Sequence, residues 1–131
     1  MLTSLRQMAN DLGLEVTFTG KMKKSDWTAL SENYSVFINT THFDNTPVSV
    51  MEAMALGLPV VSTNVGGIPY LLEDHKTALL VNDNDVMAMV DCIKKLTIDV
   101  ELKNHLVHNA LELVQQFDWD LVKNSWHEIL R

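Results

Sequence analysis

Apolar runs of strand length alternate with helix-like patterns through the first two thirds of the chain. The runs are rich in β-branched and aromatic residues, and taken together they lack the regular apolar–polar alternation of a half-exposed sheet. They cover residues 14–20, 35–40, 58–63 and 78–81. Strands of this kind that alternate with helices are typical of a parallel sheet covered on both faces. We therefore expect an α/β fold, with a Rossmann-like parallel sheet of about four strands flanked by helices.

Apolar residues at helical spacing predict the remaining elements. The expected helices cover residues 2–12, 25–34, 46–57, 84–96, 99–116 and 119–130. Their ends carry matching signals, since Gly13 is a typical C-terminal residue and Ser25 a typical N-cap. Thr46 and Pro47 predict an N-cap followed by the first helical residue. The last two helices should form a helical tail at the C-terminus.

The composition is that of an ordinary globular domain, with 47% hydrophobic and 21% charged residues. No apolar run reaches the length of a membrane helix, about 18 residues, and the N-terminus lacks the apolar core of a signal peptide. The one cysteine, Cys92, excludes an internal disulfide framework and suits a reducing compartment. We therefore expect a cytoplasmic protein without a transmembrane segment, in which Cys92 is a small buried side chain.

The formal net charge is −7, and the only basic cluster consists of Lys21, Lys23 and Lys24. A nucleic-acid-binding protein would need a basic face, so this class of partner is excluded. The three lysines either meet a small anion or lie in a solvated turn.

The segment HFDNTPVSVMEAMALGLPVVST, residues 42–63, places the carboxylate of Glu52 within an otherwise apolar helix. Burying a charge costs several kcal/mol unless a partner compensates it. The loop before this helix lies at the carboxyl end of a predicted strand, where ligands of open parallel sheets bind. The free N–H groups and the dipole of the helix attract anions there. A phosphate at that point, with hydroxyl groups held by Asp44 and Glu52, describes a nucleotide sugar.

Each of these residues also has a plain structural interpretation. Asp44 could be a loop acid near a helix start, where the helix dipole contributes about 0.3–1 kcal/mol. Glu52 could pair with a lysine, and His42 could be an ordinary loop side chain. The residue types alone leave these alternatives open.

The stretch FDNTPVSVMEAMALGLPVVSTNVGGIPYLL closely resembles the donor-binding segment of the retaining glycosyltransferases of family 4, which have the GT-B fold. Members carry an acid, seven residues and a Glu, then Ala-Met-Ala-x-Gly-x-Pro-Val-Val and Val-Gly-Gly-Ile-Pro, as does this chain. VTFTGKM, TALLV and FDWD resemble further parts of the same domain. The resemblance implies that residues 1–131 are a partial nucleotide-sugar (donor) binding domain, part of the C-terminal domain of a GT-B enzyme.

The resemblance also implies individual roles. Glu52 matches the Glu that holds the ribose hydroxyls, and Asp44 matches the acid that contacts the donor sugar near the reacting centre, so Asp44 is the expected catalytic residue. Residues 45–48 match the backbone that meets sugar and diphosphate, and Met22 matches a turn beside the base. The implied substrate-binding residues are Met22, Asn45, Thr46, Pro47, Val48, Glu52, Gly66 and Gly67. No metal ion is implied, and the nucleotide-diphospho-sugar donor is a substrate rather than a cofactor.

The chain departs from the family pattern in several places. The first acid is usually Glu, so the shorter Asp44 leaves the donor sugar open. Asn45-Thr46 replaces the usual Gly-Phe, and Tyr70 stands where an acid is common. The basic Arg–Lys pair that stabilises the leaving diphosphate, one more strand and the acceptor domain are expected before residue 1. In the sheet order of the family, the missing strands lie between the strands at residues 14–20 and 35–40. The chain must therefore pair these two strands differently, leave a sheet edge open or borrow a strand from another chain, and an open edge would suit a homo-oligomer.

The implied function is hexosyl transfer with retention from a nucleotide-diphospho-sugar to a glycan or lipid-linked acceptor, as in polysaccharide biosynthesis. We expect this chain alone to be inactive, and the intact enzyme to be cytoplasmic or peripheral at a membrane surface. Three alternatives remain: a non-catalytic nucleotide-binding module, a sugar-nucleotide 2-epimerase of the same architecture, and a self-associating interaction fragment.

Overall fold

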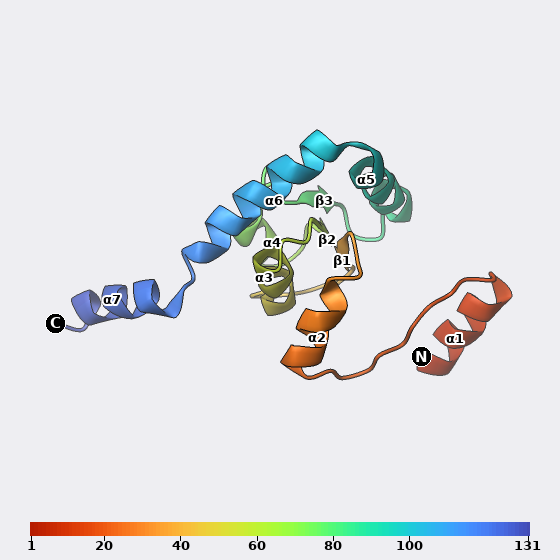
Figure 1. Cartoon of the computed structure of the whole chain (residues 1–131), viewed down its shortest axis with the longest axis horizontal. Helices are drawn as coiled ribbons and strands as arrows, with labels where there is room; N and C mark the ends of the chain where they lie inside the picture. The colour runs from red at the N-terminus through yellow and green to blue at the C-terminus, as the bar shows by residue number, and fades with distance from the viewer.

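A sheet of three parallel strands in the order β1-β2-β3 forms the centre of the computed structural model, which describes residues 1–131 (Figure 1). The strands are β1 (Phe37–Asn39), β2 (Val60–Thr63) and β3 (Leu79–Val81). The helices are α1 (Leu2–Asp11), α2 (Lys24–Ser31), α3 (Val48–Ala55), α4 (Ile68–Leu71), α5 (Val86–Ile98), α6 (Val100–Gln115) and α7 (Trp119–Ile129). The predicted α/β architecture with a parallel sheet and a helical C-terminal end is confirmed.

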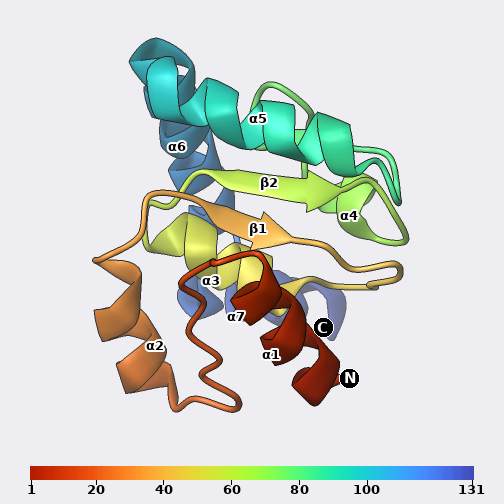
Figure 2. The same ribbon diagram turned by 90° about the vertical axis from the view of Figure 1, so that its right-hand side faces the viewer.

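Helices cover both faces of the sheet (Figure 2). On one face α3 contacts β1 and β2 and packs against α6, and on the other face α5 contacts β2 and β3. Consecutive residues of β2 point to opposite faces, so Val60 joins the core on the α3 side and Val61 the core on the α5 side. Because both faces of β2 are buried, its apolar residues Val60 and Val61 follow one another instead of alternating with polar ones.

The predicted strand at residues 14–20 is wrong, so the sheet has three strands instead of four. This segment connects α1 to α2 without pairing to another strand, and Leu14 and Val16 are 57% and 48% exposed. A strand depends on a neighbour that completes its hydrogen bonds, and β-propensity alone does not supply one. Strand β1 pairs only with β2, and Ile38 on β1 is exposed.

The starts of two helices differ from the predicted caps. α2 begins at Lys24, so Ser25 lies inside the helix rather than at its N-cap. α3 begins at Val48, with Pro47 rather than Thr46 at the N-cap. The N–H of Val48 donates to the carbonyl oxygen of Thr46 at 2.9 Å, which places Thr46 in a tight turn before the helix. Neither helix has a side-chain cap.

The C-terminus of α3 has the geometry that its glycine predicts. Gly57 has φ +77°, a left-handed conformation that favours glycine. Its N–H donates to the oxygen of Met54, and the N–H of Leu58 donates to the oxygen of Ala53, each at 3.0 Å. This pair of bonds satisfies the last carbonyls of α3 and turns the chain toward β2.

Aspartate side chains begin the three C-terminal helices. Asp85, Asp99 and Asp118 each accept a hydrogen bond from a backbone N–H of the first turn, at 3.0, 2.9 and 2.8 Å. The bounds of α5, α6 and α7 lie within two residues of the predicted ones.

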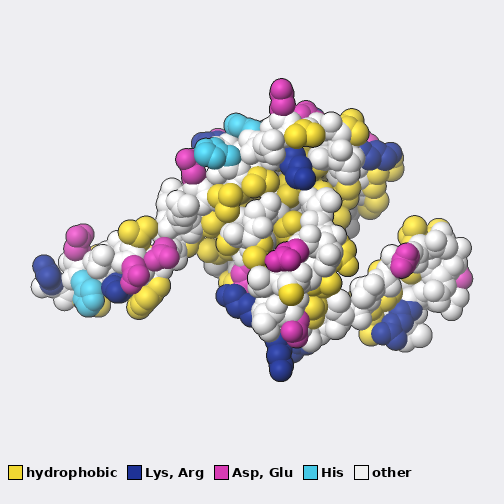
Figure 3. All heavy atoms as spheres, viewed as in Figure 1, with side chains coloured by type: hydrophobic (Ala, Val, Ile, Leu, Met, Phe, Trp, Pro, Cys, Tyr) yellow, Lys and Arg dark blue, Asp and Glu magenta, His cyan; other side chains and the backbone are white.

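The two ends of the chain lie away from the sheet. α1 and α7 project on opposite sides of the molecule (Figure 1), and hydrophobic side chains are visible on the surface of both (Figure 3). Only Ala9 of α1 is buried, and no residue of α7 is. None of the helices combines the length and the apolar character that crossing a membrane requires.

Candidate functional site

The loop from β1 to α3 carries Asp44 across the carboxyl edge of the sheet. Three contacts from other parts of the chain hold this loop. The hydroxyl of Thr63, at the end of β2, donates to the carbonyl oxygen of Thr41 at 2.6 Å. His42 Nδ1 lies 2.6 Å from Asp83 Oδ1, in the loop after β3. The third contact is made to the backbone of Asp44 itself by Gly67, in the loop after β2.

Gly66 and Gly67 pack directly against the backbone of the acidic loop, which is formed by residues 40–47 between β1 and α3 and carries Asp44. The N–H of Gly67 donates to the carbonyl oxygen of Asp44 at 2.6 Å. A Cβ atom at Gly66 would clash with the backbone oxygen of Asp44, and one at Gly67 with that of Asn45. Gly66 also has φ +54°, which disfavours other residues. The two glycines therefore bring the predicted site residues together by close backbone packing.

The N-terminus of α3 follows this loop immediately. Asp44 is half-buried, Asn45 and Thr46 are exposed, and Pro47 is buried beneath them. No side-chain oxygen caps the helix, and although the N–H of Val48 donates to Thr46, those of Ser49 and Val50 are available to an external acceptor. Residues 44–48 therefore lie at the kind of helix start where anions bind.

Glu52 lies one turn further along α3 and differs from the expectation in two respects. Its side chain is 31% exposed, so the premise of a fully buried charge is wrong. Its Oε1 atom is 3.2 Å from Nζ of Lys24, so the lysine partner left open by the sequence is present. An ion pair this exposed contributes about 0–1 kcal/mol.

A pocket of about 410 Å³ opens beside Glu52 between α3 and the segment that leads into α2. Its lining is formed by Gly20, Met22, Lys24, Trp27, Phe37, Ser49 and Glu52. The rings of Trp27 and Phe37 pack with centroids 5.8 Å apart and fix α2 against β1. The structure thus brings Met22 and Glu52, predicted from separate motifs, into one pocket. Acidic and basic side chains lie close together over this part of the surface (Figure 3).

Sequence reasoning missed a second pocket, on the other side of the acidic loop. It has a volume of about 290 Å³ and lies between the loop that carries His42 and the start of α5. The pair of His42 with Asp83 closes one side of it. These two residues are 41 positions apart. The one available signal was the run Asn-Asp-Asn-Asp directly after a predicted strand, at the carboxyl edge of the sheet.

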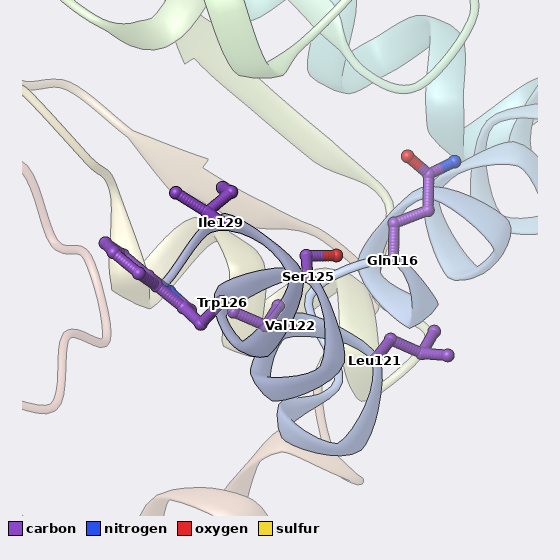
Figure 4. Close-up of a pocket in the computed structure, with 6 residues that line it drawn as sticks. All are labelled: Gln116, Leu121, Val122, Ser125, Trp126 and Ile129. Carbon is purple, nitrogen blue, oxygen red and sulfur yellow. The ribbon is translucent and has the colours of Figure 1, made fainter. Parts of the chain in front are cut away.

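A third, smaller hollow of about 170 Å³ lies along α7, remote from the acidic loop (Figure 4). Leu121, Val122, Trp126 and Ile129 line it together with Gln116 and Ser125. Cys92 is also outside the site: it is half-buried among side chains of the α5 core. Burial raises the pKa of its thiol, with a further contribution from the Asp74 carboxylate, so this side chain stays protonated at neutral pH.

The parallel sheet, the loop at its carboxyl edge and the helix start behind that loop place the chain in the α/β class of folds. The chain belongs to the glycosyl transferases group 1 family, whose sequence profile matches residues 2–99.

Two curated relatives illustrate the range of the family. The sulfoquinovosyl transferase SQD2 of Arabidopsis thaliana is 30% identical over 110 residues, which cover 82% of this chain and 22% of the relative. The D-inositol 3-phosphate glycosyltransferase of Corynebacterium glutamicum is 28% identical over 116 residues, which cover 87% of this chain and 28% of the relative. The chain thus spans 22% and 28% of the length of these relatives.

Solved structures agree with the fold over nearly the entire chain. HepE from Anabaena, in complex with UDP-glucose, superposes with a TM-score of 0.88 at 25% identity, over 98% of this chain and 36% of that one. Sucrose-phosphate synthase from Thermosynechococcus elongatus gives a TM-score of 0.86 at 24% identity, over 98% of this chain and 33% of that one. The GT-B glycosyltransferase fold expected from the sequence is therefore confirmed.

Proposed function

We propose that this chain is the donor-binding part of a glycosyltransferase that uses a nucleotide-diphospho-sugar. The diphosphate binds at the N-terminus of α3, the nucleoside enters the pocket beside Met22 and Glu52, and the donor sugar lies against Asp44. One observation carries the proposal: the uncapped start of α3 lies between a half-buried carboxylate at Asp44 and a second carboxylate at Glu52. The helix N–H groups donate hydrogen bonds to an anion, and the two carboxylates accept hydrogen bonds from hydroxyl groups on either side. This arrangement suits a molecule with a central diphosphate and a polyol at each end.

The family and its relatives support the same class of reaction. The relatives are named as transferases of sugars, and HepE has been solved with UDP-glucose and with UDP. We infer hexosyl transfer with retention, as in family 4, by an intact protein that includes an acceptor-binding domain. We assign no metal ion to this activity, because backbone N–H groups rather than a cation meet the diphosphate in the proposed arrangement. We also infer a cytoplasmic location, at a membrane surface where the acceptor is lipid-linked.

The proposal is tested by calorimetric titration of the purified chain with UDP, GDP, ADP, uridine and inorganic phosphate. We expect one nucleoside diphosphate to bind more tightly than its nucleoside and than phosphate, because only the diphosphate contacts both the helix start and the pocket. EDTA and Mg²⁺ should leave this affinity unchanged. Equal, unsaturable responses to all five compounds would contradict donor binding, and an affinity abolished by EDTA would contradict the metal-free arrangement.

Self-association is the second candidate, and the free edge of β1 favours it. Ile38 is exposed on that edge, and α1 presents Leu2, Leu5, Met8 and Leu12 to solvent. Unpaired strand edges and apolar helix faces tend to find partners. This activity is compatible with donor binding, because the free edge of β1 and the start of α3 are different parts of the molecule.

A further inference from the structure

We propose that Lys24 is a built-in competitor for the ligand at Glu52, so that a nucleoside enters the pocket by displacing the Lys24 ammonium group. The inference rests on the proposed function, because it concerns the same pocket. It adds a residue that controls the affinity of that pocket and that makes the affinity depend on ionic strength.

The ammonium group of Lys24 occupies a carboxylate oxygen of Glu52 that a ligand hydroxyl would otherwise contact. Lys24 Nζ approaches Glu52 Oε1 at 3.2 Å, and no other ion pair or hydrogen bond is made by this carboxylate. A vicinal diol donates to a carboxylate through both of its oxygens, so an ammonium group on one oxygen competes directly with the diol. Lys24 and Glu52 both line the 410 Å³ pocket, so the contested carboxylate faces the space that a ligand would occupy.

The exposure of Lys24 makes displacement easy. Its side chain is 80% exposed, so the ammonium group can leave Glu52 and remain hydrated. A pair of this kind contributes about two- to fivefold to an equilibrium constant. That contribution is small enough for a ligand to overcome and large enough to measure.

The positive charge of Lys24 does not stabilise α2 itself. Lys24 is the first residue of α2, where the helix dipole disfavours a cation. α2 is fixed instead by Trp27, whose ring packs against Phe37. Of the three clustered lysines only Lys24 has a carboxylate within 4.0 Å, so Lys23 offers a matched control with the same charge and a nearby position.

The experiment uses uridine, guanosine and adenosine, because neutral nucleosides remove the attraction between lysine and phosphate. Affinity is measured by NMR titration at about 20 mM and about 500 mM salt. The attraction between Lys24 and Glu52 is weakly screened at the lower concentration and strongly screened at the higher one. We expect wild-type affinity to rise with salt. Lys24→Met should bind about two- to fivefold more tightly than wild type at low salt, and this difference should shrink at high salt. Lys24→Arg should retain the competition, and Lys23→Met should behave like wild type.

A double variant separates competition for the Glu52 carboxylate from a general effect of removing a positive charge. In a Glu52→Gln background, Lys24→Met should produce no gain in affinity, because the contested carboxylate is gone. Unchanged or weaker nucleoside binding by Lys24→Met in the wild-type background would overturn the inference while leaving donor binding intact. If no nucleoside or nucleoside diphosphate binds to any variant, the proposed function fails and this inference fails with it.

Discussion

Replacing Glu52 by Gln removes one negative charge from the pocket and keeps the shape of the side chain. If the carboxylate holds two ligand hydroxyls, the variant loses hydrogen bonds to a charged group, each worth about 1.5–3 kcal/mol. Glutamine retains one acceptor oxygen, so we expect a net loss of about 1–3 kcal/mol, or roughly 5- to 150-fold in affinity for the nucleoside diphosphate.

The stability of the free protein should change little in the same variant. The lost ion pair joins Lys24, 80% exposed, to Glu52, 31% exposed, and such pairs contribute about 0–1 kcal/mol. The corresponding change in Tm is at most about 4 °C for a domain of this size.

Two measurements on the same preparations distinguish a ligand-binding role of Glu52 from a structural one. Calorimetric titration with the best-binding nucleoside diphosphate gives the affinity, and thermal unfolding followed by circular dichroism gives Tm. Glu112→Gln is the matched control, since Glu112 is an exposed glutamate of α6 whose Oε1 lies 3.4 Å from Nε2 of His108, away from the pocket. A large fall in Tm with unchanged affinity would show that Glu52 is structural and would refute the proposed diol contact.

Three further predictions concern the loop, the sheet edge and turnover. Gly67→Ala should lower the free energy of unfolding by about 1–3 kcal/mol in urea denaturation and weaken diphosphate binding, because a Cβ atom there displaces the backbone of Asn45; unchanged stability would contradict the observed packing. The chain should form dimers or larger species at high concentration through the free edge of β1, and light scattering that shows a monomer at all concentrations would exclude this. Incubation of this chain alone with nucleotide sugars should release nucleotide only at the background rate, since Lys24 lies at the Glu52 end of α3 and no basic side chain pairs with Asp44. Release that is lost in Asp44→Ala would show that the chain is catalytic by itself.

The sequence predicted the elements whose signals are local. Strand β2 was recognisable because it is β-branched and begins with two consecutive valines, Val60 and Val61, as burial on both faces favours. The end of α3 was recognisable because the left-handed turn there favours Gly57. The segment 14–20 was predicted wrongly, since its β-branched composition is local whereas the pairing that makes a strand depends on residues elsewhere.

The sequence identified several residues of the candidate site but not the contacts that these residues make. The motif around Asp44 and Glu52 identified the acidic loop and the following helix. It could not show which lysine pairs with Glu52, because that depends on how α2 packs against the sheet. The structural role of Gly67 was equally hidden, since it arises from contact with a loop more than 20 residues earlier in the chain. Long-range contacts of this kind follow from the fold and have no signature in one sequence.

The most direct test of the account is a titration of the isotope-labelled chain with UDP and with GDP, followed through its backbone amide resonances. Donor binding predicts saturable shifts at the start of α3, from Val48 to Val50, and at Met22 and Glu52 in the adjoining pocket. The C-terminal helix α7 should remain unaffected, because it projects away from the sheet and none of its residues is buried. Saturable shifts confined to α7, or no saturable shifts with either nucleotide, would contradict the claim that this domain binds a nucleotide sugar at the start of α3.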